Sequence, residues 1–181
     1  MNDPKTVGEL YKSYRTELYR DYPDVLRFER TKSRILLFMI CFYCALFVAK
    51  AVMLGTGAVA IVIGVIMNVG VNMIFIAAAL GPKWKIAFML YLLFLYQTVT
   101  YVSSIINAGV SSFGEFIDTY VYGFSRYPLQ CTLDVLTCVY ILLLLLLAMW
   151  LTLVPENRRR AEVSDMLQTK MKEFMQQNPV R

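Results

Sequence analysis

Four cysteines are the residues whose type and spacing could support redox or metal chemistry in this chain of 181 residues. Cys41 and Cys44 form a C-x-x-C pair, the spacing of disulfide oxidoreductases and of zinc half-sites, and Cys131 and Cys138 follow far later. The chain contains no histidine, which removes Ser-His and Cys-His catalysis and histidine metal ligation together. The depth of the cysteines in the fold must therefore decide their role.

The surroundings of both pairs argue against reactivity. Cys41 and Cys44 lie six and nine residues into an apolar run that starts at Ile35, where a thiolate would be costly. Cys131 and Cys138 are seven residues apart on one expected helix, about 10 Å and beyond disulfide reach. We expect Cys41 and Cys44 to be small packing residues on one side of a helix. We predict no catalytic residue, no metal and no cofactor, and a membrane thiol oxidoreductase ranks third among the functions weighed.

The elements that position these residues are long apolar blocks. Hydrophobic residues make up 58% of the chain, above the about 45–50% of soluble domains, and they come in uncharged runs near the about 20 residues that a bilayer requires. The blocks predict an all-α integral membrane bundle of four transmembrane helices. The expected spans are about 35–54, 56–80, 86–108 and 133–154.

Basic residues predict the orientation of the four spans. Lysines and arginines are concentrated in residues 1–34, in the turn Lys83-Trp84-Lys85 and in the tail 155–181. Four spans place all three segments on one side, and the positive-inside rule makes that side cytoplasmic, with both termini there. The net charge of +5 thus indicates membrane anchoring, and we expect the lipid bilayer and no nucleic acid as a partner.

Three regions follow: a cytoplasmic amphipathic N-terminal segment 1–34, a four-span domain 35–154 with an outer loop 109–132, and a cytoplasmic amphipathic tail 155–181. The N-terminal helix is expected on the membrane surface, with partner docking as the alternative, and Asp24 is expected to cap the helix that leads into the first span. The tail carries a stripe with Met166, Met171 and Phe174. That stripe suits a protein partner or the chain's own bundle equally well.

Polar and small residues inside the spans form the main candidate site. They are Gly57, Gly64, Asn68 and Asn72 in the second span and Gln97 and Ser104 in the third. Small residues permit close helix approach and amides bond across it, so helix packing is favoured over a pore lining, and Asn68 is placed to meet Gln97. For Lys50, near the outer end of the first span, snorkelling is favoured over pairing with Glu115, Asp118 or Asp134.

The outer loop is the second candidate surface because it is rich in aromatic residues, among them Phe116, Tyr120 and Tyr122. Their spacing predicts a short interfacial helix that ends at a turn at Tyr127-Pro128. We expect this helix to cap the bundle or to contact a partner outside, because it is too short to be a domain.

The layout resembles that of tetraspan membrane proteins in topology alone, with a minimal first outer loop and a longer second one. The Cys-Cys-Gly signature of tetraspanins and the Trp and paired-cysteine signature of claudins are missing from the sequence, so the resemblance implies no functional residue. We expect a non-enzymatic scaffold, trafficking or stabilising partner of other membrane proteins, with a homo-oligomer as one form. The alternative is a small oligomeric channel or transporter subunit. The patterns do not distinguish the plasma membrane from endomembranes.

Overall fold

A computed structural model describes residues 7–81, 87–107, 109–110 and 112–177. Every regular element in those ranges is a helix. In chain order they are α1 Val7–Leu18, α2 Pro23–Met53, α3 Ala58–Gly64, the π-helix η1 Val65–Val69, α4 Gly70–Leu80, α5 Phe88–Asn107, α6 Phe113–Arg126, α7 Pro128–Thr152 and α8 Pro155–Gln177.

Four stretches of helix are long and apolar enough to cross a membrane. They are α2, the continuous run Ala58–Leu80 through α3, η1 and α4, then α5 and α7. This confirms the all-helical class with four spans, and it indicates a multi-pass integral membrane protein. The predicted outer helix is present as α6 and ends at Tyr127 before Pro128.

Two spans begin earlier than the apolar pattern indicated. The α2 helix runs unbroken from Pro23, its N-cap is Tyr22, and Asp24 lies inside the first turn, so the expected cap at Asp24 was wrong. The α7 helix begins at Pro128 and not near Leu133. A proline at the first helical position fixes φ and lacks only an N–H that would have no helical partner, so both prolines start helices before the apolar segment begins.

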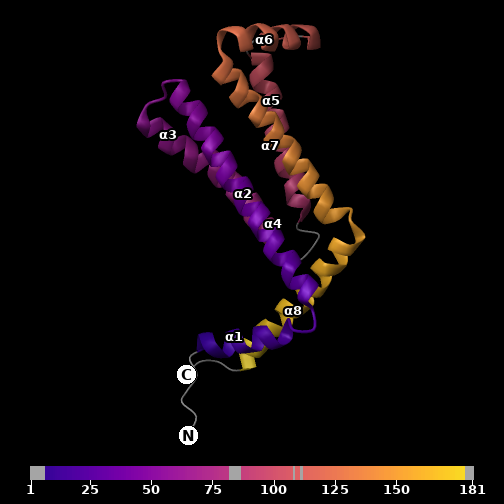
Figure 1. Cartoon of the computed structure of the whole chain (residues 1–181). Helices are drawn as coiled ribbons and strands as arrows, with labels where there is room; N and C mark the ends of the chain where they lie inside the picture. The colour runs from indigo at the N-terminus through magenta and orange to yellow at the C-terminus, as the bar shows by residue number, and fades with distance from the viewer. Residues whose placement is uncertain (1–6, 82–86, 108, 111, 178–181) are drawn as a thin grey trace.

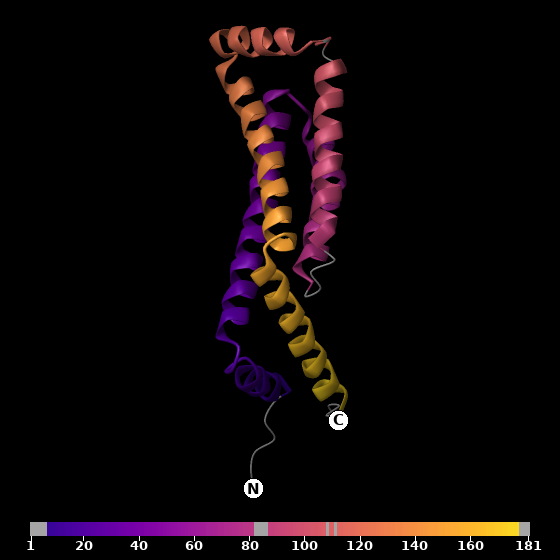
Figure 2. The ribbon, with the colours of Figure 1, turned by 90° about the vertical axis from the view of Figure 1, so that its right-hand side faces the viewer.

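The spans run side by side along the long direction of the molecule (Figures 1 and 2). The α6 helix lies across one end and joins α5 to α7, and we call this the α6 end. The α1 and α8 helices lie at the opposite end, which we call the terminal end. The spanning helices therefore have further helices at both ends, α6 at one and α1 and α8 at the other.

Local sequence explains the joints between helices. Gly55 has φ of 65°, a conformation that glycine adopts without strain, and it closes the tight hairpin between α2 and α3. Ser112 and Glu115 form a capping box at the start of α6: the Glu115 amide donates to Ser112 Oγ, and the Ser112 amide donates to Glu115 Oε2. This S-x-x-E pattern fixes where α6 turns away from α5.

The core lies between α2, α4, α5 and α7. Its fully buried side chains include Leu36, Ile76, Leu90, Leu93, Tyr140 and Leu144. A second, smaller cluster at the terminal end joins Tyr19 and Val25 to Leu167 and Met171 of α8. The bundle thus extends beyond the spans into a packed contact between the two ends of the chain.

The apolar stripe of α1 packs against α8, where the sequence favoured the membrane surface. Tyr11, Tyr14 and Leu18 contact the second cluster, and the rings of Tyr14 and Phe174 stack with centroids 4.0 Å apart. Two amphipathic helices brought to one end can bury their apolar stripes against each other, which removes both from water or headgroups. Phe174 therefore contacts Tyr14 of α1, and Met171 is part of the second cluster.

Candidate functional site

A cluster of three buried polar side chains joins three spans near the centre of the bundle. Asn72 of α4 is fully buried, and its Oδ1 accepts two hydrogen bonds. One comes from Gln97 Nε2 of α5 at 3.1 Å and the other from the Tyr140 hydroxyl of α7 at 2.9 Å. We call this group the central clamp, because each bond crosses from one spanning helix to another.

The first span completes the arrangement through aromatic contacts. The Tyr140 ring lies 4.9 Å from the Tyr43 ring and 6.2 Å from the Phe42 ring, measured between centroids, and both partners belong to α2. Aromatic pairs at these separations stabilise a contact beyond their buried area. All four spans therefore meet around Tyr140, an aromatic residue that the sequence pattern did not single out.

The expected meeting of Asn68 with Gln97 was wrong, because Gln97 bonds to Asn72, one helical turn further along. Asn68 Nδ2 donates instead to the Gly64 carbonyl of its own helix at 3.2 Å. Asn72 Nδ2 donates to the Asn68 carbonyl at 2.8 Å. Both amides thus satisfy backbone groups in and beside the π-helical segment, where the regular hydrogen-bond ladder changes.

The two glycines of the predicted packing sector differ in their surroundings. A Cβ at Gly64 would lie 2.6 Å from Phe47 Cζ, so this glycine lets an α2 ring approach the second span. A Cβ at Gly57 would meet nothing within 4 Å. Among the described residues, no close helix contact therefore requires a glycine at position 57, just before α3.

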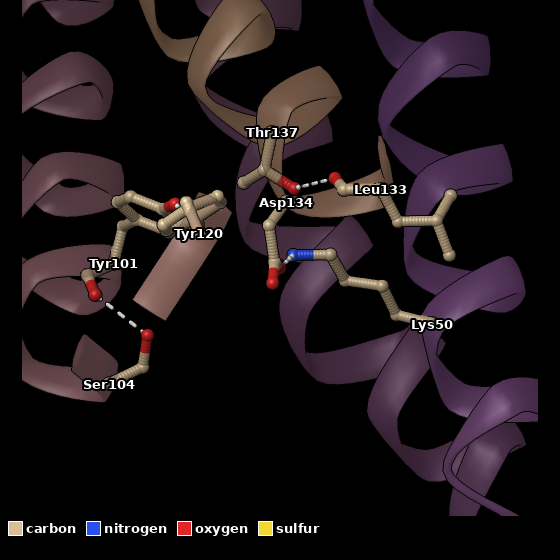
Figure 3. A network of polar contacts seen from close by, with 7 residues as sticks. All are labelled: Lys50, Tyr101, Ser104, Tyr120, Leu133, Asp134 and Thr137. Atoms are coloured by element: carbon tan, nitrogen blue, oxygen red, sulfur yellow. Dashed lines mark hydrogen bonds and ion pairs between the residues drawn. The ribbon is translucent and has the colours of Figure 1, made fainter. Parts of the chain in front are cut away.

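A second polar network lies at the α6 end, between α2, α5, α6 and α7 (Figure 3). Lys50 Nζ and Asp134 Oδ1 are 2.7 Å apart, and both side chains are about one-third exposed. The favoured snorkelling of Lys50 was therefore wrong, since a half-buried ammonium near a carboxylate gains more from pairing than from reaching for water. The pair joins the first span to the fourth.

Two hydroxyls connect α6 to the same network. Tyr101 and Tyr120 hydroxyls are 2.6 Å apart, and Ser104 Oγ donates to the Tyr101 carbonyl at 2.7 Å. Burial raises the pKa of the Tyr120 phenol, so it stays neutral and protonated. A hollow of about 270 Å³ lies beside these groups; its lining includes Ser104, Phe116, Tyr120, Cys131 and Asp134.

The partner-contact candidates divide between packed and exposed positions. Phe116 and Tyr120 are half-buried against each other, with ring centroids 4.6 Å apart. Tyr122 is 63% exposed on α6, and Met166 is 41% exposed on α8. Met171 is buried in the second cluster. Among these five residues, therefore, Tyr122 and Met166 are the exposed ones.

The four cysteines are free thiols in different environments. Cys41 is exposed, Cys44 and Cys138 are half-buried, and Cys131 is buried. A Cβ at Gly123 would lie 2.8 Å from Cys131 Sγ, so Cys131 packs directly beneath α6. Cys41 and Cys44 do not share one packed surface as expected. Within the described ranges, no group of three or more Cys, Asp or Glu side chains is placed to hold a metal ion.

A third polar cluster lies at the terminal end around Glu29. Its Oε1 accepts hydrogen bonds from the Tyr19 hydroxyl at 2.8 Å and from Ser164 Oγ, and Arg15 Nη2 lies 3.9 Å from Oε2. Burial and the bond to Glu29 raise the pKa of Tyr19. The carboxylate thus ties α1, α2 and α8 together.

These features define a multi-pass integral membrane protein whose internal polar groups bond to one another. The sequence matches no family model, and neither the curated proteins nor the solved structures compared with it show a significant similarity.

Proposed function

We propose that the chain is a non-enzymatic four-pass membrane protein that acts by contact, as a scaffold, trafficking or stabilising partner of other membrane proteins. The observation that carries this proposal is that the buried polar side chains of the interior bond within the chain. Across the described residues, no fully buried side-chain nitrogen or oxygen lacks a hydrogen-bond partner. Asn72, Gln97 and Tyr140 use their polar atoms on each other, which favours a structural role over transport.

The surfaces at the two ends supply the contacts. On α6, Tyr122 is exposed, and so are Ile117 and Val121, at 45% and 69%. At the other end Met166 is exposed on α8. Aromatic residues and methionine are enriched at the contact surfaces of proteins, which supports partner binding at these two places.

The proposed orientation places the terminal end in the cytoplasm. Residues 1–34 carry eight lysines and arginines and the tail carries six, and the described parts of these two segments include α1 and α8 at the terminal end. A single cysteine at Ser125 in a cysteine-free variant should react with an impermeant thiol reagent from outside. A cysteine at Thr169 should react only after the membrane is opened, and the reverse pattern contradicts the orientation.

Site-specific photo-crosslinking in native membranes tests the contact function. A photoreactive residue is placed at Tyr122 or at Met166, and at Leu142 of α7 as the control, because Leu142 is 57% exposed on a spanning helix. We expect a discrete protein adduct from Tyr122 or Met166 that is missing from Leu142. A second copy of the chain or a different membrane protein would both satisfy the proposal, whereas lipid adducts alone at all three positions would reject it.

A further inference from the structure

A hollow of about 390 Å³ opens at the terminal end, where α1, α2, α4 and α8 converge. Its lining contains four cationic side chains, Arg15, Arg30, Lys32 and Arg34, against one acid, Glu29. Ser33, Ser164 and Gln168 add hydrogen-bonding groups, with Phe28 and Leu80 as apolar wall. The charge of this lining is positive, and it is distinct from both networks that join the spans.

Lys32 is the most informative residue of the hollow. It is 7% exposed, and its Nζ donates to the Gly81 carbonyl at 2.7 Å. Within the described residues, no carboxylate lies within 4.0 Å of this ammonium. Residues 82–86, which follow Gly81, contain no acidic residue in the sequence. A buried ammonium whose contact partner is a neutral carbonyl retains two N–H donors and has no carboxylate in contact with its charge, which is costly without an added anion.

Glu29 attracts the Lys32 charge from a distance, but no Glu29 oxygen lies within 4.0 Å of Nζ, so it leaves the remaining N–H donors open. Its carboxylate already accepts bonds from Tyr19 and Ser164, and Arg15 is its ion-pair partner. Arg30 and Arg34 are exposed and, among the described side chains, pair with no acid within 4.0 Å. Four residues apart on α2, they lie on one side of the helix, whereas Lys32, two residues from each, reaches the hollow from another side. The hollow therefore has one buried ammonium and two guanidinium groups available to an added anion.

The depth of the hollow identifies the kind of anion. Arg34 is the last charged residue before the uncharged stretch that starts at Ile35 and reaches Ala49. The hollow therefore lies at the level where charged sequence gives way to apolar sequence, which is the level of lipid headgroups. Guanidinium forks and an ammonium match the oxygens of a phosphate, and Phe28 and Leu80 can lie against the glycerol and upper acyl carbons.

We propose that this hollow binds the phosphate of an anionic membrane lipid, with Lys32, Arg30 and Arg34 as its ligands. The bound phosphate compensates the charge of Lys32. It also bridges α2 to α8, because Ser164 and Gln168 of α8 line the same hollow. An occupied site stabilises the packing of α8 on α2. The site is separate from the contact surfaces at Tyr122 and Met166.

The test uses the full chain, purified in a neutral detergent and titrated with phosphatidic acid in mixed micelles. Phosphatidylcholine is the zwitterionic comparison, and inorganic phosphate is the water-soluble source of the same group. Bound lipid is counted by native mass spectrometry, and thermal unfolding is followed in parallel. We expect one tightly bound phosphatidic acid and a higher unfolding temperature, with no comparable effect of phosphatidylcholine or inorganic phosphate.

Two variants locate the site, and a third controls for charge. In Lys32→Met, and separately in Arg30→Gln/Arg34→Gln, the affinity for phosphatidic acid should fall by about tenfold or more. Lys32→Met should also be at least as stable as the natural chain without lipid, because it removes an uncompensated buried charge. The matched control Arg27→Gln/Lys170→Gln removes two exposed cationic groups outside the hollow and should change the affinity by less than about twofold.

Three outcomes would overturn the proposal. Equal loss of affinity in the control and the site variants would show diffuse attraction to basic residues. If inorganic phosphate raises the unfolding temperature as much as phosphatidic acid does, the ligand is a free phosphate and not a lipid. If Lys32→Met binds phosphatidic acid as tightly as the natural chain, or is less stable than it without lipid, the Lys32 ammonium is not a ligand of the phosphate.

Discussion

Replacing Asn72 with leucine is the change that most strongly perturbs the central clamp. The substitution keeps a side chain of similar size but removes the oxygen that accepts from Gln97 and from Tyr140. It therefore breaks the links from α4 to α5 and from α4 to α7 at once. The amide of Gln97, which is 5% exposed, and the hydroxyl of Tyr140, which is fully buried, then lose their acceptor.

The expected loss of stability follows from those two bonds. Hydrogen bonds between spanning helices average about 0.6 kcal/mol and reach about 1.7 kcal/mol, so two of them give about 1–3 kcal/mol. An unsatisfied buried donor costs about 1–3 kcal/mol, although part of that cost is relieved when Gln97 finds another acceptor. We expect Asn72→Leu to lower the free energy of unfolding by about 2–4 kcal/mol.

Unfolding by SDS in mixed micelles, followed by tryptophan fluorescence, measures this change. Trp150 is a suitable reporter because its ring lies 5.7 Å from the Phe28 ring in the core. Asn68→Leu is the matched control, since the Asn68 side chain bonds only within its own helix, and it should cost less than about 0.5 kcal/mol.

A triple variant separates the clamp from a general sensitivity of the site. Asn72→Leu/Gln97→Leu/Tyr140→Phe removes the three polar groups of the central clamp together, which should recover most of the stability lost in Asn72→Leu alone. Equal stability of Asn72→Leu and the natural chain would refute the clamp. A triple variant that is no more stable than Asn72→Leu would show that packing, and not hydrogen bonding, explains the loss.

Three further predictions concern other contacts. Lys50→Met should lower the free energy of unfolding by about 1 kcal/mol because Asp134 loses its partner, and Lys50→Met/Asp134→Leu should restore it; a double variant less stable than either single one would contradict the pairing. Gly64→Leu should lower the free energy of unfolding by about 1–3 kcal/mol, because the new side chain clashes with the Phe47 ring of α2. The control Gly57→Leu should change it by less than about 0.5 kcal/mol, and equal losses in the two variants would argue against the close approach at Gly64. Ser164→Ala should speed amide hydrogen exchange in α8 about fivefold, because about 1 kcal/mol of bonding to Glu29 is lost, and unchanged exchange would show that this bond does not hold α8.

The sequence predicted the spans because lipid imposes a simple requirement on length and polarity. Runs of about 20 uncharged residues stand out in a chain with 58% hydrophobic residues, and the helices follow them closely. The early starts at Pro23 and Pro128 were also readable, since proline favours the first helical position. So was the capping box of α6, because Ser112 and Glu115 have the S-x-x-E spacing.

The sequence did not predict how each helix is rotated about its own axis, and this rotation determines which side chains meet in the candidate site. Asn68 and Asn72 are one turn apart on one face, so periodicity alone could not say which of them meets Gln97. Tyr140 lies in an almost uniformly apolar span, in which the alternation of polar and apolar residues does not indicate which side faces the other helices. The acid that pairs with Lys50 was one of three candidates of similar depth, and only the packing of α7 selects Asp134.

The pairing of the two ends was missed for a related reason. The stripes of α1 and α8 are each amphipathic, and such a stripe can face lipid, a partner or another stripe. Their contact brings residues such as Tyr14 and Phe174, 160 positions apart in sequence, into one stack. Long-range contacts of this kind follow from the whole topology and not from local pattern.

Solute flux through proteoliposomes measures whether the interior polar groups hold the helices together and leave no pathway across the bundle. The purified chain is reconstituted at known density, and the release of potassium and of a small neutral solute is compared with that of empty liposomes. We expect the proteoliposomes and the empty liposomes to release both solutes at the same rate. Release above that of empty liposomes that is abolished by Gln97→Leu, in a variant shown to be folded, would contradict it and assign the central polar residues to transport.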